Sequence, residues 1–256
     1  MPSSTLPTMS LVLPEQLSSD TEHRFDDQLE ACLQQRPQAV EIDSSQLGVV
    51  TSAHVALLVH IFKTCRQAGI VVRLVSPALD LARVLQVLDL YELFVDGNAP
   101  DAMLLMSNST CPNIAAGTEE VYSDEFSADA EGINRATEDF RQALKRLHIS
   151  PLVASELRTV FYEVATNIRN HACLNCRERV KFESWTTKSR IMMVFTDSGQ
   201  PFDPTMIPVE MDLTRAATDR QKDGLGIAII RKLTDRMSYE RRDNTTNVLK
   251  LEKRWS

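Results

Sequence analysis

The hydrophobic pattern of the first hundred residues alternates between short apolar runs and longer amphipathic segments. Runs typical of buried strands occur at residues 11–13, 40–42 and 70–75. Segments with the helical spacing of apolar residues occur at 21–33 and 53–68, and a third follows residue 75 and contains Leu81, Val84, Leu85 and Leu88. Because strands and helices alternate, we predict an α/β fold here, with a mainly parallel sheet covered by helices.

In the second half of the chain, the helices and strands come in groups. Strand-like runs lie at residues 121–126, 180–185, 191–196 and 248–251, and helical patterns lie at 131–147, 151–171 and 225–237. This order predicts an α+β fold of two layers, with the helices on one face of a sheet. The stretch between the halves mixes Ser, Asn, Thr, Pro and Gly without periodicity. We therefore predict one domain at 1–103, a linker at 104–118 and a second domain at 119–256.

A polar stripe follows one edge of the predicted helix at 151–171. At about 100° per residue, four apolar side chains fall in one arc: Leu157, Phe161, Val164 and Ile168. Glu163, Asn167 and His171 are spaced four residues apart and border this arc. Two interpretations stay open at this point. The stripe is either a solvated edge of the helix, or it places a carboxylate and an amide at a pocket between helix and sheet.

Two downstream segments carry glycines where the backbone must turn or approach a ligand. An apolar strand ends at Asp197, two residues before Gly199. There a carboxylate can hold a purine amino group while the glycine lets the backbone approach the ring, although an ordinary Asp-Gly turn has the same pattern. Gly224 and Gly226 then open an apolar helix, whose N-terminal N–H groups suit a phosphate.

Taken together, four motifs in this order resemble a known family. They are E-V-A-T-N-I-R-N-H-A from Glu163, D-S-G-Q-P-F-D-P from Asp197, D-G-L-G-I-A-I-I-R-K-L from Asp223 and Y-E-R-R-D-N-T-T-N-V-L-K-L from Tyr239. The set resembles the anti-sigma-factor serine kinases, a bacterial branch of the gyrase/histidine-kinase (GHKL) ATPase superfamily, and it covers residues 119–256. The resemblance implies the two-layer α/β sandwich of these ATPases (the Bergerat type), with ATP and Mg²⁺ as cofactors.

The resemblance also implies a role for individual residues. Glu163 matches the general base for a protein hydroxyl, Asn167 matches the magnesium ligand, and Asp197 matches the residue that binds adenine. The implied nucleotide-binding set is Asn167, His171, Asp197, Gly199, Gly224, Leu225, Gly226 and Thr246. Arg215, Arg220 and Lys222 fall in the expected lid over the phosphates. Asp223 stands where the family commonly has glycine, and an anion beside a triphosphate would weaken ATP binding unless it points away.

The first half carries a second resemblance. The runs A-V-E-I-D-S-S-Q-L-G-V-V-T-S-A-H-V-A-L-L and V-S-P-A-L-D-L-A-R-V-L-Q-V-L-D-L-Y-E-L-F are similar to STAS domains, the fold of the anti-sigma-factor antagonists. In that family a phosphorylated serine opens the helix after the second strand. Ser52 occupies this place, with Thr51 where an Asp is usual and His54 where a Gly is usual. Ser52 and Thr51 are therefore candidate phosphoacceptors, and the alternative is that Ser52 only caps the helix.

Composition narrows the class of protein. The net charge of −7 argues against binding to nucleic acid. The longest apolar run, residues 55–62, is too short for a membrane span, and five cysteines without regular spacing suit a cytoplasmic protein. We expect a partner-switching regulator that phosphorylates serine or threonine of a STAS-domain protein, with a STAS-domain anti-sigma-factor antagonist, a sigma factor or both as partners. A homodimer is a further expectation, since kinases of this branch are commonly dimeric. The alternative is a nucleotide-binding docking module without kinase activity.

Overall fold

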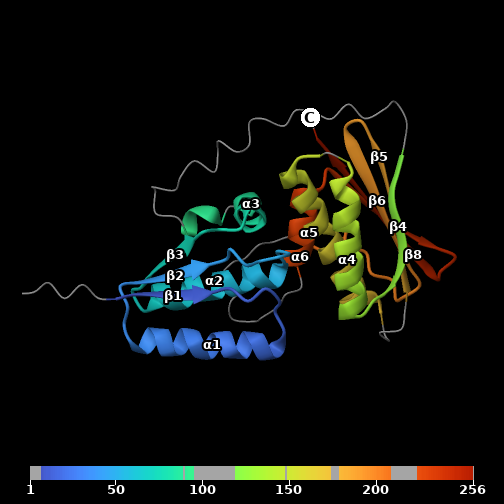
Figure 1. Cartoon of the computed structure of the whole chain (residues 1–256). Coiled ribbons are helices and arrows are strands. Elements are labelled where there is room, and N and C mark those ends of the chain that lie inside the picture. The colour runs from blue at the N-terminus through green and yellow to red at the C-terminus, as the bar shows by residue number, and fades with distance from the viewer. Residues whose placement is uncertain are drawn as a thin grey trace, which may run out of the picture. The chain divides into compact units, whose positions relative to one another are not determined.

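The computed structural model describes residues 7–88, 90–94, 119–147, 149–173, 179–208 and 224–255. The chain forms two compact units, one containing the described residues up to 94 and the other those from 119 onward. The predicted linker at 104–118 lies outside the described residues, and so do the predicted lid residues and Asp223. Figure 1 colours the first unit blue to green and the second green to red.

The first unit is a parallel sheet with helical connections. Its elements are β1 (Thr8–Val12), α1 (Ser19–Gln34), β2 (Ala39–Asp43), α2 (Ser52–Gln67), β3 (Val71–Val75), α3 (Leu79–Val87) and the short 3₁₀ helix η1 (Tyr91–Leu93). The strand order is β1-β2-β3, with Leu11, Ile42 and Leu74 side by side in register. These three side chains are buried because successive strand residues face opposite sides of a sheet. The predicted parallel α/β sheet is confirmed.

Helix α2 begins with a cap made by its own side chains. Thr51 is the N-cap residue, and its hydroxyl accepts a hydrogen bond from the backbone N–H of His54. The reading in which Ser52 caps this helix is therefore wrong, because Ser52 is already the first helical residue. A residue with helical backbone angles cannot direct its hydroxyl to the N–H groups two or three positions ahead, as an extended N-cap residue does.

The second unit is an antiparallel sheet covered by helices on one face (Figure 1). Its elements are β4 (Glu119–Ser127), α4 (Ala130–Lys145), α5 (Pro151–Asn167), the π-turn η3 (Ile168–Ala172), β5 (Arg179–Thr187), β6 (Arg190–Asp197), α6 (Leu225–Leu233), β7 (Arg236–Arg242) and β8 (Thr246–Arg254). The strand order is β4-β5-β6-β8-β7. This arrangement confirms the predicted two layers.

An aromatic core joins these two layers. Phe161 on α5 lies edge-on to Phe182 on β5, with ring centroids 4.7 Å apart, and Phe140 on α4 packs on the same ring at 5.0 Å. All three rings are buried completely. Edge-to-face aromatic pairs add about 0.5–1.5 kcal/mol beyond the area that they bury. The core thus fixes α5, which carries the predicted polar stripe, on the sheet.

Two predicted helix ends are wrong. The helix expected at 225–237 ends at Leu233, and Met237 lies in β7, an edge strand that the sequence pattern did not indicate. The strand was missed because charged or polar residues surround Met237 and Tyr239, so this segment shows no clear apolar face. The helix expected at 151–171 is α-helical only to Asn167 and then widens into η3. His171 therefore does not continue the α-helical spacing of Glu163 and Asn167.

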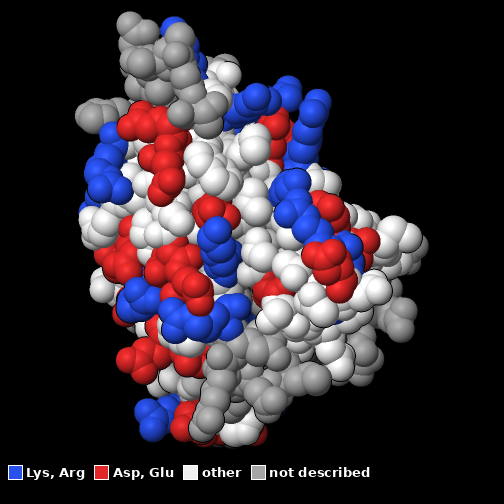
Figure 2. Space-filling view, turned by 90° about the vertical axis from the view of Figure 1, so that its right-hand side faces the viewer, with Lys and Arg blue, Asp and Glu red and all other residues white. Residues whose placement is uncertain are grey.

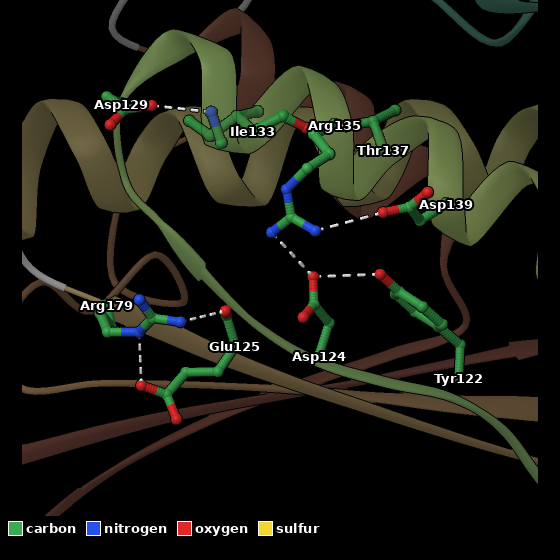
Figure 3. A network of polar contacts seen from close by, with 10 residues as sticks. Tyr122, Asp124, Glu125, Asp129, Ile133, Arg135, Thr137, Asp139 and Arg179 are labelled. Carbon is green, nitrogen blue, oxygen red and sulfur yellow. Dashed lines mark hydrogen bonds and ion pairs between the residues drawn. The ribbon is translucent and has the colours of Figure 1, made fainter.

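Polar contacts join α4 to β4, the strand at one edge of the sheet (Figure 3). The hydroxyl of Tyr122 on β4 donates a hydrogen bond to Asp124 at 3.1 Å. Arg135 on α4 forms ion pairs with both Asp124 and Asp139, each at 3.3 Å. Because Arg135 and Asp139 are about half exposed to solvent, each ion pair contributes about 0–1 kcal/mol. The network links α4 to β4 near the surface, at the edge of the sheet that lies opposite to β7.

Over the face shown in Figure 2, positive and negative side chains are interspersed. In the second unit, ion pairs join Arg179 on β5 to Glu125 on β4 and Arg190 on β6 to Glu252 on β8, and Arg242 pairs with Glu240 on the same strand, β7. Among the described residues, no helix combines the length and the apolar composition that a bilayer span requires.

Candidate functional site

Three of the sequence-predicted residues meet where α5 packs against α6. Glu163 is 2% exposed, and Gly226 lies directly against it. A Cβ atom on Gly226 would lie 2.5 Å from Oε2 of Glu163 and 3.6 Å from Oδ1 of Asn167. Only a glycine leaves room for both polar groups at this contact. The stripe on α5 is therefore not a solvated edge, because Glu163 is turned toward the neighbouring helix.

The amino terminus of α6 lies beside these two groups. Gly224 is its N-cap residue, with a φ of 144° that residues with a side chain rarely adopt, and Leu225 is its first helical residue. The first N–H groups of any α-helix have no partner within the helix, and they attract anions. Gly224, Leu225 and Gly226 thus form a helix end that is suited to a phosphate, next to a carboxylate and an amide.

Asp197 closes the other end of the site. It is the last residue of β6 and is 6% exposed. Its Oδ1 atom accepts hydrogen bonds from the backbone N–H of Gly199 at 2.9 Å and from Nδ2 of Asn247 at 2.6 Å. A Cβ atom on Gly199 would lie 2.3 Å from the carbonyl oxygen of Ala172. This contact requires the glycine, and it holds the loop after β6 against the π-turn.

A pocket runs between these two ends. It is lined by Val164, Asn167, Ile168, Ala172, Asp197, Phe202, Pro204, Ile230, Tyr239, Asn247 and Leu249. Its open volume, including the part continuous with solvent, is about 360 Å³. The lining is mainly apolar, with four polar side chains that converge on it. A mainly apolar lining with a few convergent polar groups is typical of small-ligand sites.

Arg231 holds the loop that forms one wall of this pocket. From α6, its Nη2 atom donates hydrogen bonds to the carbonyl oxygens of Pro204 at 2.9 Å and Thr205 at 2.7 Å. Asp203 fixes the same turn by accepting from the backbone and the hydroxyl of Thr205. The wall that carries Phe202 and Pro204 is therefore tied to α6, the helix that begins beside Glu163 and Asn167.

His171 and Thr246, also predicted from the sequence, do not line the pocket. The ring of His171, in η3, stacks on the ring of Phe202 with centroids 4.4 Å apart and planes inclined by 10°. The His171 ring therefore packs on Phe202, which itself lines the pocket. Thr246 is the first residue of β8, and its hydroxyl lies 3.5 Å from that of Thr245. The next residue, Asn247, faces the pocket instead, because neighbouring strand residues point to opposite faces.

Asn247 is the main site residue that the sequence analysis missed. It is 3% exposed, and its Oδ1 atom accepts hydrogen bonds from the hydroxyl of Tyr239 and from Nη1 of Arg241, both at 2.6 Å. A signal for it exists in the sequence. Asn247 shares the period-two face of Leu249 and Leu251, so an amide interrupts an apolar strand face, where burial demands hydrogen-bond partners.

The residues present fit an adenine nucleotide with magnesium. Within the described part of the chain, Nδ2 of Asn167 is buried without a hydrogen-bond partner, so this amide has a polar group left for a ligand. Rotation of the amide presents its oxygen in the same direction, and Mg²⁺ takes such oxygens together with substrate phosphates and water. No cluster of three His, Cys, Asp or Glu exists among the described residues. A site completed by phosphate oxygens does not need one.

The two candidate phosphoacceptors in the first unit have different surroundings. The backbone N–H of Thr51 donates to Nδ1 of His54 at 3.1 Å, and the Thr51 hydroxyl lies 2.8 Å from the same nitrogen. His54 in turn contacts the carbonyl oxygen of Pro14 through Nε2 at 3.1 Å. Burial is the largest effect on the pKa of His54 and lowers it. Because Nδ1 accepts from the Thr51 N–H and Nε2 faces a carbonyl oxygen, the ring proton lies on Nε2. The Thr51 hydroxyl is thereby occupied as a cap, whereas Ser52 is half-buried at the first helical position.

Comparison with known proteins supports both units. A family model described as histidine kinase-like ATPase domain matches residues 126–253, and one described as Mlab, STAS domain matches residues 2–96. No curated protein matches the chain. A solved chain from the SiaB-SiaC complex of Pseudomonas aeruginosa is 15% identical, with a TM-score of 0.42, over 52% of this chain and 89% of that one. Since the ATPase model spans half of its length, the chain belongs to the histidine kinase-like ATPase domain family, with a STAS domain preceding the ATPase domain.

Proposed function

We propose that the second unit binds Mg-ATP and transfers its γ-phosphoryl group to a serine or threonine of a STAS domain. The observation that carries the proposal is the meeting of Glu163, Asn167 and Gly226, where one glycine makes room for a buried carboxylate and an amide at a helix amino terminus. ATPase family membership supports ATP as the ligand. The transfer itself and its acceptor are the new content of the proposal.

In this proposal, one end of the pocket binds the base of the nucleotide and the other end binds its phosphates. At the inner end, Asp197 accepts a hydrogen bond from the amino group of the base, and Phe202 and Leu249 border the apolar surface on which the ring lies. At the other end, the first N–H groups of α6 hold phosphate oxygens, and the side-chain oxygen of Asn167 binds the metal. A bound magnesium ion would offset the negative charge of the phosphates.

Glu163 serves as the general base in this proposal. The acceptor hydroxyl oxygen forms a bond to the γ-phosphorus, the bond from that phosphorus to the bridging oxygen breaks, and ADP leaves. The hydroxyl proton passes to the Glu163 carboxylate. Because Glu163 is buried against α6, its carboxylate is held in one place and need not be ordered when the acceptor arrives.

The acceptor that we propose in this chain is Ser52. It is the first residue of α2, where the positive end of the helix dipole stabilises a phosphate dianion. Two domains in one chain reach an effective concentration in about the millimolar range when the linker is short, so even a weak contact is populated. The STAS unit then acts as substrate in cis, as autoinhibitor or as docking platform for a STAS-domain partner or a sigma factor, as in bacterial partner switching.

Incubation of the full chain with magnesium and γ-labelled ATP tests this proposal. We expect label that is lost in Glu163→Gln, lost in Ser52→Ala and kept in Thr51→Ala. The matched control is Glu156→Gln on the same helix, whose carboxylate forms a buried ion pair with Lys253 at 2.7 Å. This control lowers stability but leaves the label. Wild-type protein that labels neither itself nor an added STAS-domain protein, and does not differ from Glu163→Gln, would contradict the proposal.

A second candidate is a docking module that binds nucleotide without transferring phosphate. The observation that favours it is the cap at Thr51, where a hydroxyl held by His54 stands at the position that is usually an aspartate. Calorimetry separates the two candidates. Saturable uptake of Mg-ATP with no label on any protein would establish the docking module and exclude the kinase.

A further inference from the structure

The amide of Asn247 is held from both sides inside the second unit. Its Nδ2 atom donates to Oδ1 of Asp197 at 2.6 Å and to the carbonyl oxygen of Gln200 at 3.0 Å. Its Oδ1 atom accepts from Tyr239 and Arg241, each at 2.6 Å. Register places Asn247 directly opposite Asp197 in the β6–β8 pair. Every hydrogen-bonding position of a buried amide is thereby used by a named partner.

The two groups behind Asn247 decide which way its amide points. An arginine carries only donors and stays charged. Burial, the largest effect, raises the pKa of Tyr239, so its phenol also stays protonated and donates. With two donors on that side, the amide must present its oxygen to them and its NH₂ group to Asp197. A flipped amide would oppose donor to donor at two contacts of 2.6 Å.

Arg241 ties this arrangement to the backbone around the base. Its Nη1 atom also donates to the carbonyl oxygen of Gly199 at 2.8 Å, and its Nη2 atom donates to that of Asn244 at 2.7 Å. Asn244 lies in the β7–β8 turn, where Asp243 and Asn244 both have positive φ angles. One guanidinium thus joins the turn, the Asn247 amide and the loop after β6.

We infer that Asn247, clamped by Tyr239 and Arg241, is a positioning residue that makes the pocket select a purine with an amino group at its six-position over one with a carbonyl. Oδ1 of Asp197 already accepts two hydrogen bonds, from Gly199 and from Asn247. Each carboxylate oxygen has two acceptor positions. In this proposal Oδ2 meets the base, along a direction that the bond from Asn247 to Oδ1 helps to fix. A carboxylate oxygen there accepts from an amino group and repels a carbonyl oxygen.

This inference rests on the proposed function, because it concerns the base of the nucleotide that the site takes up. It adds a prediction about Asn247 that differs from a purely structural role. If the amide only stabilised the fold, its loss would weaken Mg-ATP and Mg-GTP binding by the same factor. If it sets the direction of Asp197, its loss lets the carboxylate rotate, and the preference for ATP falls.

The experiment measures dissociation constants of Mg-ATP and Mg-GTP by calorimetry on the full chain. In Asn247→Leu we expect the ATP preference to fall by about tenfold, the equivalent of one hydrogen bond. Asn247→Thr, which retains a hydroxyl donor, restores part of it. Tyr239→Phe removes only one donor behind the amide and gives a smaller fall, which keeps the test decisive if Asn247→Leu does not fold.

Tyr122→Phe is the matched control, since it also removes a phenol that donates to a side-chain oxygen, in the same sheet but on β4 (Figure 3). It leaves the preference unchanged. A folded Asn247→Leu or Tyr239→Phe protein with the wild-type ratio would overturn the inference and leave the proposed function standing. Wild-type protein that takes up neither nucleotide would overturn the proposed function, and this inference with it.

Discussion

Two helices of this protein begin in opposite ways, α2 in the first unit and α6 in the second. The first turn of α2 is closed by its own residues, since Thr51 and His54 satisfy each other's backbone N–H groups. Helix α6 begins at Gly224, and within the described residues no side chain caps it. A closed helix end contributes stability, whereas an open one leaves donors for a ligand. In our proposal the open end holds the donor nucleotide, and the closed end presents the acceptor hydroxyl.

The largest effect is expected from adding a side chain at the uncapped amino terminus of α6. Gly226→Ala places a methyl group 2.5 Å from the former position of Glu163 Oε2, so the carboxylate must move. Since a shift of about 1 Å in a catalytic group can lower a rate by about 100-fold, we expect a loss of that size in phosphate transfer. The affinity for Mg-ATP should change far less. Both quantities come from labelling and calorimetry on the same preparation.

Gly48→Ala is the matched control for Gly226→Ala. Its added methyl group would also approach a carboxylate oxygen, Oε1 of Glu15 at 3.0 Å, but Glu15 is exposed and can swing away. This variant should transfer phosphate like the wild type. Equal losses in the two variants would show that a displaced Glu163 is not the cause.

A smaller effect is expected from removing the N-cap of α2. Thr51→Ala removes the N-cap of α2, and such losses cost about 1 kcal/mol of unfolding free energy. Urea unfolding measures this difference, and Mg-ATP affinity in the second unit should stay at the wild-type value. A variant as stable as the wild type would mean that the cap contributes nothing to α2.

The smallest effect is a pH dependence that comes from His54. Burial lowers the pKa of His54 in the folded chain below its ordinary value of 6.5. Between these two pKa values the unfolded chain binds more protons, so the stability is fully present above pH 6.5 and is lost as the pH falls. From pH 7 to pH 6 we expect a loss below about 1.4 kcal/mol, the full value for one proton per pH unit.

The slope in stability should vanish in His54→Gln and persist in His60→Gln, a half-exposed position on the same helix. Urea titrations at a series of pH values provide the measurement. An identical slope in both variants would assign the effect to other groups.

Periodicity predicted those parts of the structure in which one face of an element is buried. The four residues of the predicted apolar arc, three on α5 and Ile168 at the start of η3, are at most 6% exposed, as their spacing predicts. The edge strand β7 was not predicted, because the side chains of residues 236–242 are exposed or only half-buried on both faces. Periodicity also did not indicate the π-turn, whose contacts reach residues far along the chain, as in the hydrogen bond from the Gln200 N–H to the Ala172 carbonyl oxygen.

Within the candidate site, the sequence indicated single residues better than their partners. The sequence analysis assigned Glu163 and Asn167 to one helix and Gly226 to a later helix start, and the structure places the three together. Asn247 was not named, because its importance depends on strand register, which puts it opposite Asp197. Which of these groups contact ligand stays a prediction. Hydrogen bonds between side chains from different elements are fixed by tertiary packing, which no local pattern records.

The π-turn has a consequence for which changes the site can accept. A single residue removed from 168–172 would rotate the remaining residues of this helical turn by about 100°. The Ala172 carbonyl would leave the Gln200 N–H, and the His171 ring would leave Phe202. Replacing a side chain in this turn disturbs one contact, whereas shortening the turn disturbs all of them. Related chains that keep the pocket should therefore vary in the composition of this turn and not in its length.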